Sequence, residues 1–397
     1  MSTSALPALI ERAASPTASP DGCWPTRGQE LLLRAALLDG ESAVGSWNEW
    51  RHTTDLAGID IESRRLFPQL YRNLKRHSID DPLLDRFKEA FSRTYFENHM
   101  LFGRATAVLR AMEESGIPTL VLKGVAMATA YYRDLGLRPM LDFDILVPTD
   151  RALEAMSVLK RLGWHGTYDR HPEDRIEVAH SVPFREPTSR QIDLHWHVLT
   201  ECWHADDDQG FWNHAVPLEI DGVPTRRLDA TDQLLHTCVH GRKWDDPPPI
   251  RWVADACTIL GLSASEIDWD RFIRNLEYRH LVLPAADALV YLRDRFEARV
   301  PGAVIDRLRD APTTRVDRFI YRMETAPYRR LSTVEVLGIL YADLMRIGTS
   351  RRGVHRVTAF ARRTRALWRH YPAWQLPFRL PVRLLRRAVG RIVRWRD

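Results

Sequence analysis

Hydrophobic residues recur at helical spacing along the first third of the chain. The segments QELLLRAALL and SRRLFPQLYRNLKR place apolar side chains three or four positions apart, which predicts helices between residues 29 and about 117. The segment DPLLDRFKEAFSRTYFENHMLFGRATAVLRAMEESG is predicted to be one long helix. Asp80 or Asp81 is its expected N-cap and Gly116 its expected C-cap.

The pattern changes after residue 117. Short apolar runs bounded by Pro or Gly, PTLVLKG and LDFDILVP, indicate two buried strands. SVPFREP and RQIDLHWHVL predict two more, and VPLEIDGVPTRRL has an Asp-Gly pair between alternating runs, which indicates a β-hairpin. Two helices, VAMATAYYRD and TDRALEAMSVLKRLGW, are predicted between the strands.

From residue 230 to about 348 the apolar positions return to helical spacing. The predicted fold class is therefore α+β, a small mixed β-sheet flanked by N-terminal and C-terminal helical regions. The predicted regions are a disordered N-terminus rich in Ser, Pro and Ala at 1–25, a helical region at 26–117, an α/β core at 118–228, a second helical region at 229–350 and an Arg-rich tail at 351–397.

The net charge of +5 is unevenly distributed. Residues 351–397 contain 14 arginines and one acidic residue, and the other 43 basic and 51 acidic residues give the rest of the chain a net charge of −8. The end of this tail, LPVRLLRRAVGRIVRWRD, predicts a basic amphipathic helix. Its expected partners are an anionic membrane surface, RNA, a partner protein, or the acidic remainder of the chain.

Composition limits the class of protein. No apolar run approaches the ~18 residues of a membrane span, and the first residues lack the pattern of a signal peptide. The four cysteines form no CxxC pair, which favours reduced thiols over a disulfide framework or a zinc ribbon. We therefore expect a cytoplasmic protein.

Two aspartates lie two positions apart in the apolar run LDFDILVP. Strand alternation places Asp142 and Asp144 on the same face of the sheet. Burying two ionised carboxylates costs several kcal/mol each without compensation, and a divalent cation such as Mg²⁺ provides that compensation. Capping of the strand ends, or pairing with Arg133 and Arg138, explains the same pattern, so a lone D-x-D leaves both interpretations open.

A later strand carries a third carboxylate. QIDLHWHV places Asp193, His195 and His197 on one face, and this strand has the composition to lie beside LDFDILVP. Upstream, Gly124 ends a strand before a helix, where a glycine lets a phosphate approach the backbone. Lys123 adds a cation there, although a Lys-Gly pair also fits a simple turn.

The order of these motifs resembles the polymerase-beta-like nucleotidyltransferase superfamily. The motifs are a strand-Gly-helix unit, then a strand with D-x-D, then a later strand with an aspartate between apolar residues. More narrowly, the chain is similar to the family of uncharacterised nucleotidyltransferases over about residues 118–262. The segments that carry this similarity are VLKGVAMATAYY, LRPMLDFDILVP, QIDLHWHV, and LLHTCVHG followed by IRWVADACTIL. Members often occur in bacterial gene clusters for peptide natural products. The resemblance implies a sheet of nucleotidyltransferase type.

The resemblance also implies an enzyme that transfers a nucleoside monophosphate from an NTP, expected to be ATP, to an unknown acceptor, a small molecule or a peptide. Asp142 and Asp144 would hold two Mg²⁺ ions, and Asp193 would hold the second ion and help to activate the acceptor oxygen. The implied nucleotide-binding residues are Lys123, Gly124, Arg138 and His240.

Two alternatives remain open. The first is a Zn²⁺- or Mn²⁺-dependent hydrolase that uses Asp193, His195 and His197, with His240 as a further candidate, because imidazoles suit Zn²⁺ better than Mg²⁺. The second is a non-catalytic adaptor of a biosynthetic complex, which keeps the fold without turnover.

Other residues carry more ordinary expectations. His236 and His240 are four apart on one helix face, which favours structural hydrogen bonding over metal ligation. Arg251 and Asp255 are also four apart and are expected to form an intrahelical ion pair. Replacing Asp144 by Asn is expected to leave stability unchanged or raised, because it relieves carboxylate repulsion.

Overall fold

The computed structural model describes residues 23–166, 176, 179–186, 191–202, 205–241 and 247–325. Every helix and strand named below belongs to one compact unit. The Arg-rich tail lies outside the described residues, as does nearly all of the N-terminus predicted to be disordered. The division of the chain into five regions stays a prediction.

Five helices of the described chain precede the sheet. They are α2 (Arg27–Leu37), α3 (Gly40–Thr53), α4 (Ile61–Arg64), α5 (Phe67–Arg76) and α6 (Leu84–Glu114). Helix α2 begins with a capping box formed by Thr26 and Gln29. Helix α6, which spans 31 residues, confirms the predicted long helix, but the expected N-cap at Asp80 or Asp81 is wrong, because the N-cap is Leu83. It ends at a left-handed Gly116, and the Ile117 amide donates to Met112 O at 2.9 Å.

Seven strands of the described chain form one mixed sheet. They are β1 (Leu120–Val121), β2 (Asp142–Leu146), β3 (His165–Gly166), β4 (Ser181–Arg185), β5 (Gln191–His195), β6 (Val216–Ile220) and β7 (Val223–Arg227). Their order is β3-β4-β5-β2-β1-β7-β6, and β2 is parallel to β5 and antiparallel to β1. The predicted hairpin is β6-β7. The sheet with its flanking helices confirms the α+β fold class.

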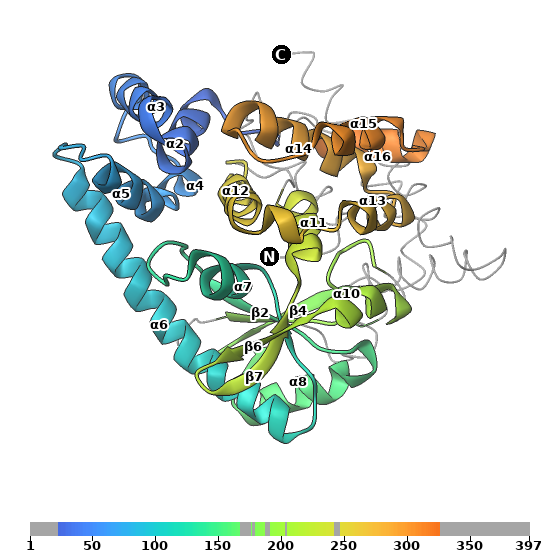
Figure 1. The fold of residues 1–397 in the computed structure, drawn as a ribbon. Helices are drawn as coiled ribbons and strands as arrows, with labels where there is room; N and C mark the ends of the chain where they lie inside the picture. The colour runs from blue at the N-terminus through green and yellow to red at the C-terminus, as the bar shows by residue number, and fades with distance from the viewer. Residues whose placement is uncertain are drawn as a thin grey trace, which may run out of the picture. The chain divides into compact units, whose positions relative to one another are not determined.

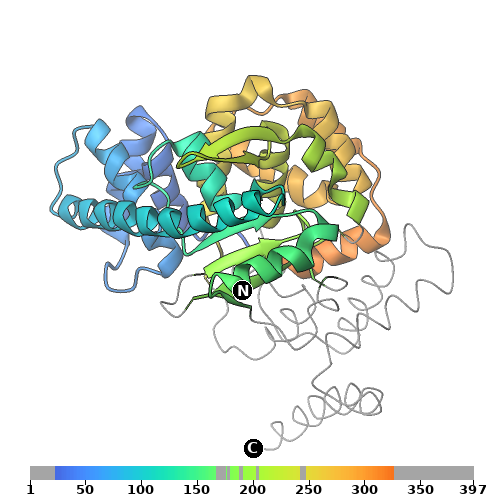
Figure 2. The ribbon, with the colours of Figure 1, turned by 90° about the horizontal axis from the view of Figure 1, so that it is seen from below.

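The central strands β4, β5 and β2 have one apolar face. Its fully buried side chains are Phe143, Ile145, Val182, Phe184, Ile192 and Leu194. Helix α6 packs on this apolar face, where the rings of Phe102 and Phe143 lie 5.7 Å apart between centroids. Figure 2 shows α6 and α8 (Ala152–Arg161) in front of the sheet when it is seen from below. The aspartates of β2 and β5 therefore belong to the opposite face.

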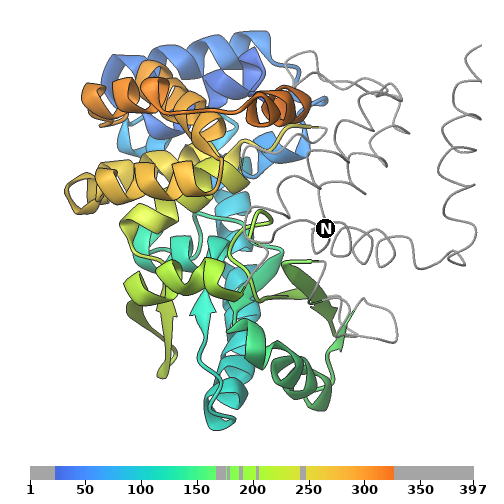
Figure 3. The same cartoon turned by 90° about the vertical axis from the view of Figure 1, so that its right-hand side faces the viewer.

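The helices that follow the sheet are α11 (Ala230–His240), α12 (Arg251–Ser263), η5 (Ala264–Glu266), α13 (Trp269–Tyr278), α14 (Val282–Phe296), α15 (Gly302–Asp310) and α16 (Arg315–Thr325). Helices α11 and α12 lie on the side of the sheet away from α8 (Figure 1). The N-terminal and C-terminal helices share one hydrophobic core, and they lie side by side in Figure 3. Tyr291 in α14, for example, donates to Glu30 Oε2 in α2 at 3.2 Å.

The connecting elements differ in detail from the sequence prediction. They are α7 (Lys123–Ala126), η2 (Met127–Tyr132), η3 (Thr149–Arg151), η4 (Ala205–Asp208) and α10 (Gln209–His214). The predicted helix after Gly124 is one α-turn followed by the π-helix η2, which closes at a left-handed Arg133. Strand β5 ends at His195 because the amides of Trp196 and His197 both donate to His180 O.

A buried ion pair joins the segment before β2 to helix α12. Arg138 donates through Nε and Nη2 to the carboxylate of Asp255 at 2.8–3.1 Å, and Tyr132 Oη donates to the same carboxylate at 3.0 Å. Arg138 is 8% exposed and Asp255 5%, so the pair is shielded from water. The predicted pairing of Asp255 with Arg251 is wrong, because Arg251 Nη1 instead donates to Pro139 O at 2.9 Å.

Gly124 makes room for this ion pair. A Cβ atom at position 124 would lie 2.5 Å from Arg138 Nη1 and 2.7 Å from Met140 Sδ. Any side chain there would push Arg138, and its guanidinium is held on the far side by Asp255. The absence of a side chain at Gly124 is therefore a packing requirement in this structure.

No helix among the described residues is both long and apolar enough to cross a membrane. None of the four cysteines takes part in a disulfide, and three of them are buried. A cytoplasmic location stays a prediction.

We predict that Gly124→Ala destabilises the protein by about 1–3 kcal/mol, because overpacking here displaces a buried ion pair. Gly103→Ala is the matched control, since nothing lies within 4 Å of a Cβ atom at that helical position. The control should gain about 0.5–1 kcal/mol through the higher helix propensity of alanine. Urea unfolding measures both. Equal stability of Gly124→Ala and wild type would show that Arg138 does not depend on the space at Gly124.

Candidate active site

The parallel pairing of β2 with β5 places two aspartates side by side. Asp144 and Asp193 are register partners, so their side chains leave the sheet on the same face from strands about 4.8 Å apart. Asp144 is 1% exposed and Asp193 3%. Asp142, one pleat earlier in β2, is only half-buried. Of the three aspartates expected at one site, Asp144 and Asp193 are thus brought together by the register of the sheet, and Asp142 pairs with Gln191 one pleat away.

Lys123 supplies a cation to this pair. Its Nζ lies 2.6 Å from Asp144 Oδ1, and its backbone adopts a φ of 46°, which L-residues rarely adopt outside a structure that enforces it. Burial opposes the charge of Lys123, but the carboxylates of Asp144, Asp142 and Asp193 raise its pKa above the ordinary value. Lys123 is therefore a charged group at the sheet's carboxylates.

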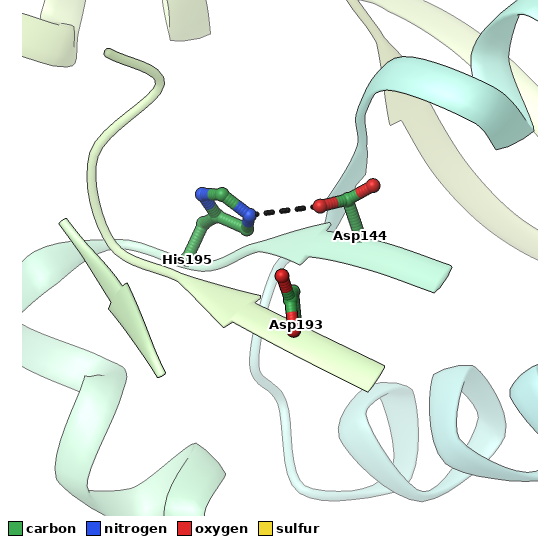
Figure 4. Close-up of side chains that lie close together, drawn as sticks. All are labelled: Asp144, Asp193 and His195. Carbon is green, nitrogen blue, oxygen red and sulfur yellow. Dashed lines mark hydrogen bonds and ion pairs between the residues drawn. The ribbon is translucent and has the colours of Figure 1, made fainter. Parts of the chain in front are cut away.

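His195 contacts the same oxygen. Its Nε2 lies 3.0 Å from Asp144 Oδ1, as Figure 4 shows, and the ring is fully buried. Nε2 must carry a proton, because two acceptor atoms facing each other would repel. Among the described residues, His195 Nδ1 has no hydrogen-bond partner. A metal-binding imidazole normally donates its second N–H to a partner, so these contacts suit a donor to Asp144 better than a metal ligand.

The carboxylates differ in their electrostatic state. Burial alone would raise the pKa of Asp144, but the Lys123 ammonium and the His195 hydrogen bond hold it below the usual range. For Asp142, burial and the neighbouring Asp144 charge together raise the pKa to about 6. Of these two carboxylates, Asp142 is therefore the one whose charge is compensated less, and a divalent cation would supply that compensation.

The donor set fits a divalent cation. Among the described residues, the side chains of Asp144, Asp193 and His195 each offer an atom within 4.8 Å of the other two. Gln191 Nε2 donates to Asp193 Oδ1 at 2.8 Å and orients that carboxylate. Carboxylate oxygens are the donors that Mg²⁺ prefers, so Asp144 and Asp193 are the groups that would hold it. Asp142, predicted as a further ligand, is not part of this close group of described residues.

Other predicted site residues have different contacts. His197 lies beyond the end of β5, and its Nδ1 pairs with Asp208, so it does not join His195 at the carboxylates. His240, the last residue of α11, stacks on His236 at 5.1 Å between centroids. Arg138 and Gly124 pack against each other. Nucleotide-binding roles for Lys123, Gly124, Arg138 and His240 stay predictions.

The sequence analysis assigned no role at this site to Gln191. It assigned a role to His195 only in the hydrolase alternative. Both alternate with Asp193 on strand β5, so the period of two was a usable signal for shared orientation. The hydrogen bonds they make have no local sequence signal.

The chain belongs to the family described as uncharacterised nucleotidyltransferase, which matches residues 48–297. It is accordingly an enzyme of the nucleotidyltransferase class. No curated protein matches the chain.

Two solved structures are similar to parts of this chain. The antibiotic-resistance factor ANT(2'')-Ia, in a solution structure, has 17% identity and a TM-score of 0.34, covering 47% of this chain and 96% of its own. An antigenic nucleotidyltransferase-like protein from Paracoccidioides brasiliensis has 11% identity and a TM-score of 0.34, covering 54% and 94%.

The contacts of Asp144 reverse our sequence-based expectation for its replacement. We predict that Asp144→Asn lowers the free energy of unfolding by about 2–4 kcal/mol, because it leaves the Lys123 ammonium without its ionised partner. Lys123→Met combined with Asp144→Asn should return to within about 1 kcal/mol of wild type. Asp193→Asn is the control, since the Asp193 carboxylate accepts its hydrogen bond from the neutral amide of Gln191.

Chemical denaturation of the four proteins tests this coupling. A double variant that is no more stable than Asp144→Asn would contradict the assignment of Lys123 as the cation that stabilises Asp144.

Proposed function

We propose that this nucleotidyltransferase transfers a nucleoside monophosphate from an NTP to an acceptor hydroxyl or phosphate, with Mg²⁺ bound by the aspartates. The observation that carries the proposal is the register of β2 with β5, which sets Asp144 beside Asp193 with Asp142 one pleat away. The three carboxylates carry more negative charge than the single lysine beside them can neutralise. This excess suits a site that is completed by divalent cations and a phosphate chain.

In the proposed reaction, the acceptor oxygen forms a bond to the α-phosphorus, and the bond from that phosphorus to the bridging oxygen breaks. Pyrophosphate leaves, and the acceptor proton passes to Asp193 or to water. Bound Mg²⁺ would neutralise the phosphate oxygens and lower the pKa of the acceptor hydroxyl. His195 and Lys123 orient Asp144, and Gln191 orients Asp193, so both carboxylates are positioned before substrate arrives.

The finer assignments remain our proposals. We infer ATP as the nucleotide, two Mg²⁺ ions, and a small molecule or peptide of a bacterial natural-product pathway as the acceptor, in the cytoplasm. These follow from the family resemblance. A contact of the Arg-rich tail with an anionic membrane surface, RNA or a partner protein is likewise a prediction about residues outside those described.

The alternatives receive less support. A zinc or manganese hydrolase built on Asp193, His195 and His197 needs the two imidazoles together, whereas His197 pairs with Asp208. A non-catalytic adaptor would have no need for a left-handed Lys123 held against a buried carboxylate, an arrangement that costs about 1–3 kcal/mol of backbone strain.

We predict that Mg²⁺ together with an NTP raises the melting temperature of the wild type, by linkage of binding to folding. Asp193→Asn should lose this increment, since one of the two paired carboxylates is gone. Asp150→Asn, an exposed aspartate close to β2 in sequence, should keep it. Differential scanning fluorimetry with each of the four NTPs, with and without Mg²⁺, measures the shift.

Activity is tested with labelled nucleotides and candidate peptides from neighbouring genes as acceptors. Label from the α-phosphate should appear on the acceptor, and label from the γ-phosphate should appear in pyrophosphate. Transfer of the γ-label would instead indicate a kinase, and absence of any NTP-dependent shift or transfer would refute the proposed function.

A further inference from the structure

Among the described residues, three arginines on the α12 side of the sheet share two carboxylates as their ion-pair partners. Arg138 is bound by Asp255, and Arg65 is paired with Glu62. Arg251, the first residue of α12, has no carboxylate within hydrogen-bond distance among the described residues, and its nearest one, Glu62 Oε2, lies 3.8 Å from Arg251 Nε. Consistent with that gap, Glu62 Oε2 has no hydrogen-bond partner among the described residues. The group therefore carries one excess positive charge.

The excess charge is next to the carboxylates. Arg251 Nη1 donates to Pro139 O at 2.9 Å, which fixes the guanidinium beside the segment that leads into Asp142. Pro139 precedes Asp142, the half-buried end of the carboxylate row, by three residues, so the guanidinium of Arg251 lies near the start of β2.

Arg251 also differs from Arg138 in access. The side chain of Arg251 is 27% exposed, whereas that of Arg138 is 10% exposed and bound by two of its nitrogens. Burial and the neighbouring charges of Arg138 and Arg65 lower the pKa of Arg251 to about 10, which reflects a cation in an unfavourable surrounding. A bound anion would relieve that repulsion, and a guanidinium presents a planar fork that matches phosphate oxygens.

We propose that Arg251, with Arg65 beside it, binds the triphosphate of the nucleotide, and that Arg138 is a positioning residue that holds α12 against the segment before Asp142. The inference rests on the proposed function, because the carboxylates alone would repel a triphosphate. It moves the phosphate-binding role that the sequence suggested for Arg138 to a residue of the C-terminal helices.

The test is calorimetric titration of the full chain with tripolyphosphate, inorganic phosphate and Mg²⁺-ATP. Arg251→Met should bind tripolyphosphate about 10- to 100-fold more weakly than wild type, the loss expected for charge-assisted hydrogen bonds. Arg251→Lys keeps the charge but loses the fork, so it should give an intermediate affinity. Inorganic phosphate should bind more weakly than tripolyphosphate, because it spans fewer donors.

Arg151→Met is the matched control. Arg151 also donates to backbone carbonyls, those of Gly116 and Ser115, pairs with one glutamate and is 32% exposed, but it lies at the start of the α8 segment. Its replacement should leave tripolyphosphate binding unchanged. Melting temperatures check that each variant is folded, and if Arg251→Met does not fold, Arg251→Lys carries the comparison.

Wild-type affinity for tripolyphosphate in a folded Arg251 variant would overturn this inference while leaving the proposed function intact. Stronger binding of inorganic phosphate than of tripolyphosphate would overturn it too, since it would indicate a site for a single phosphate group on another molecule. Failure of wild type to bind Mg²⁺-ATP would refute both the inference and the proposed function.

Discussion

Two carboxylates held in register across adjacent buried strands repel each other, and this repulsion governs the architecture of the site. The protein stabilises one of them, Asp144, with a lysine from the neighbouring strand-to-helix turn and a hydrogen bond from His195. Bringing Lys123 to that oxygen requires a left-handed backbone. Among the described residues, the hydrogen bond to the second carboxylate, Asp193, comes from the neutral amide of Gln191. The carboxylates on this face of the sheet are therefore stabilised enough for the protein to fold, but their negative charge is not fully neutralised.

A second constraint ties the sheet to the helices that follow it. The ion pair between Arg138 and Asp255 spans 117 residues of sequence and is closed by a hydroxyl from Tyr132. The guanidinium of Arg138 packs over Gly124, in the turn that also contains Lys123, and it binds Asp255 in α12, the helix that carries Arg251. The ion pair between Arg138 and Asp255 therefore fixes this turn and α12 together. The stability of this contact and the geometry of the carboxylate face are consequently linked, although Asp255 itself is not one of the carboxylates of the sheet.

Local patterns in the sequence predicted much of this arrangement. Period-two alternation placed Asp142 and Asp144 on one face, and the runs bounded by Pro and Gly located the main strands. What alternation cannot specify is the partner of a charged side chain, because that depends on contacts distant in sequence. Arg251 and Asp255 have ideal spacing for an intrahelical pair, yet a buried arginine from another segment competes successfully for Asp255. Likewise, nothing near His197 indicates that Asp208 will pair with it.

Under the proposed function, the exposure of the side chains along the strands sets how a substrate would approach. Asp144, Asp193 and His195 are almost fully buried, whereas Asp142 and Gln191, at the start of β2 and β5, are half-buried. In the proposed function, an incoming phosphate chain would meet Asp142 first, at the end of the row where the charges of Lys123 and Arg251 also act. A cation bound there would be shared between protein and nucleotide, and the deeper carboxylates would remain for the reacting oxygen. Under the proposed function, the less buried carboxylate at the start of the paired strands would therefore meet the substrate before the more buried ones.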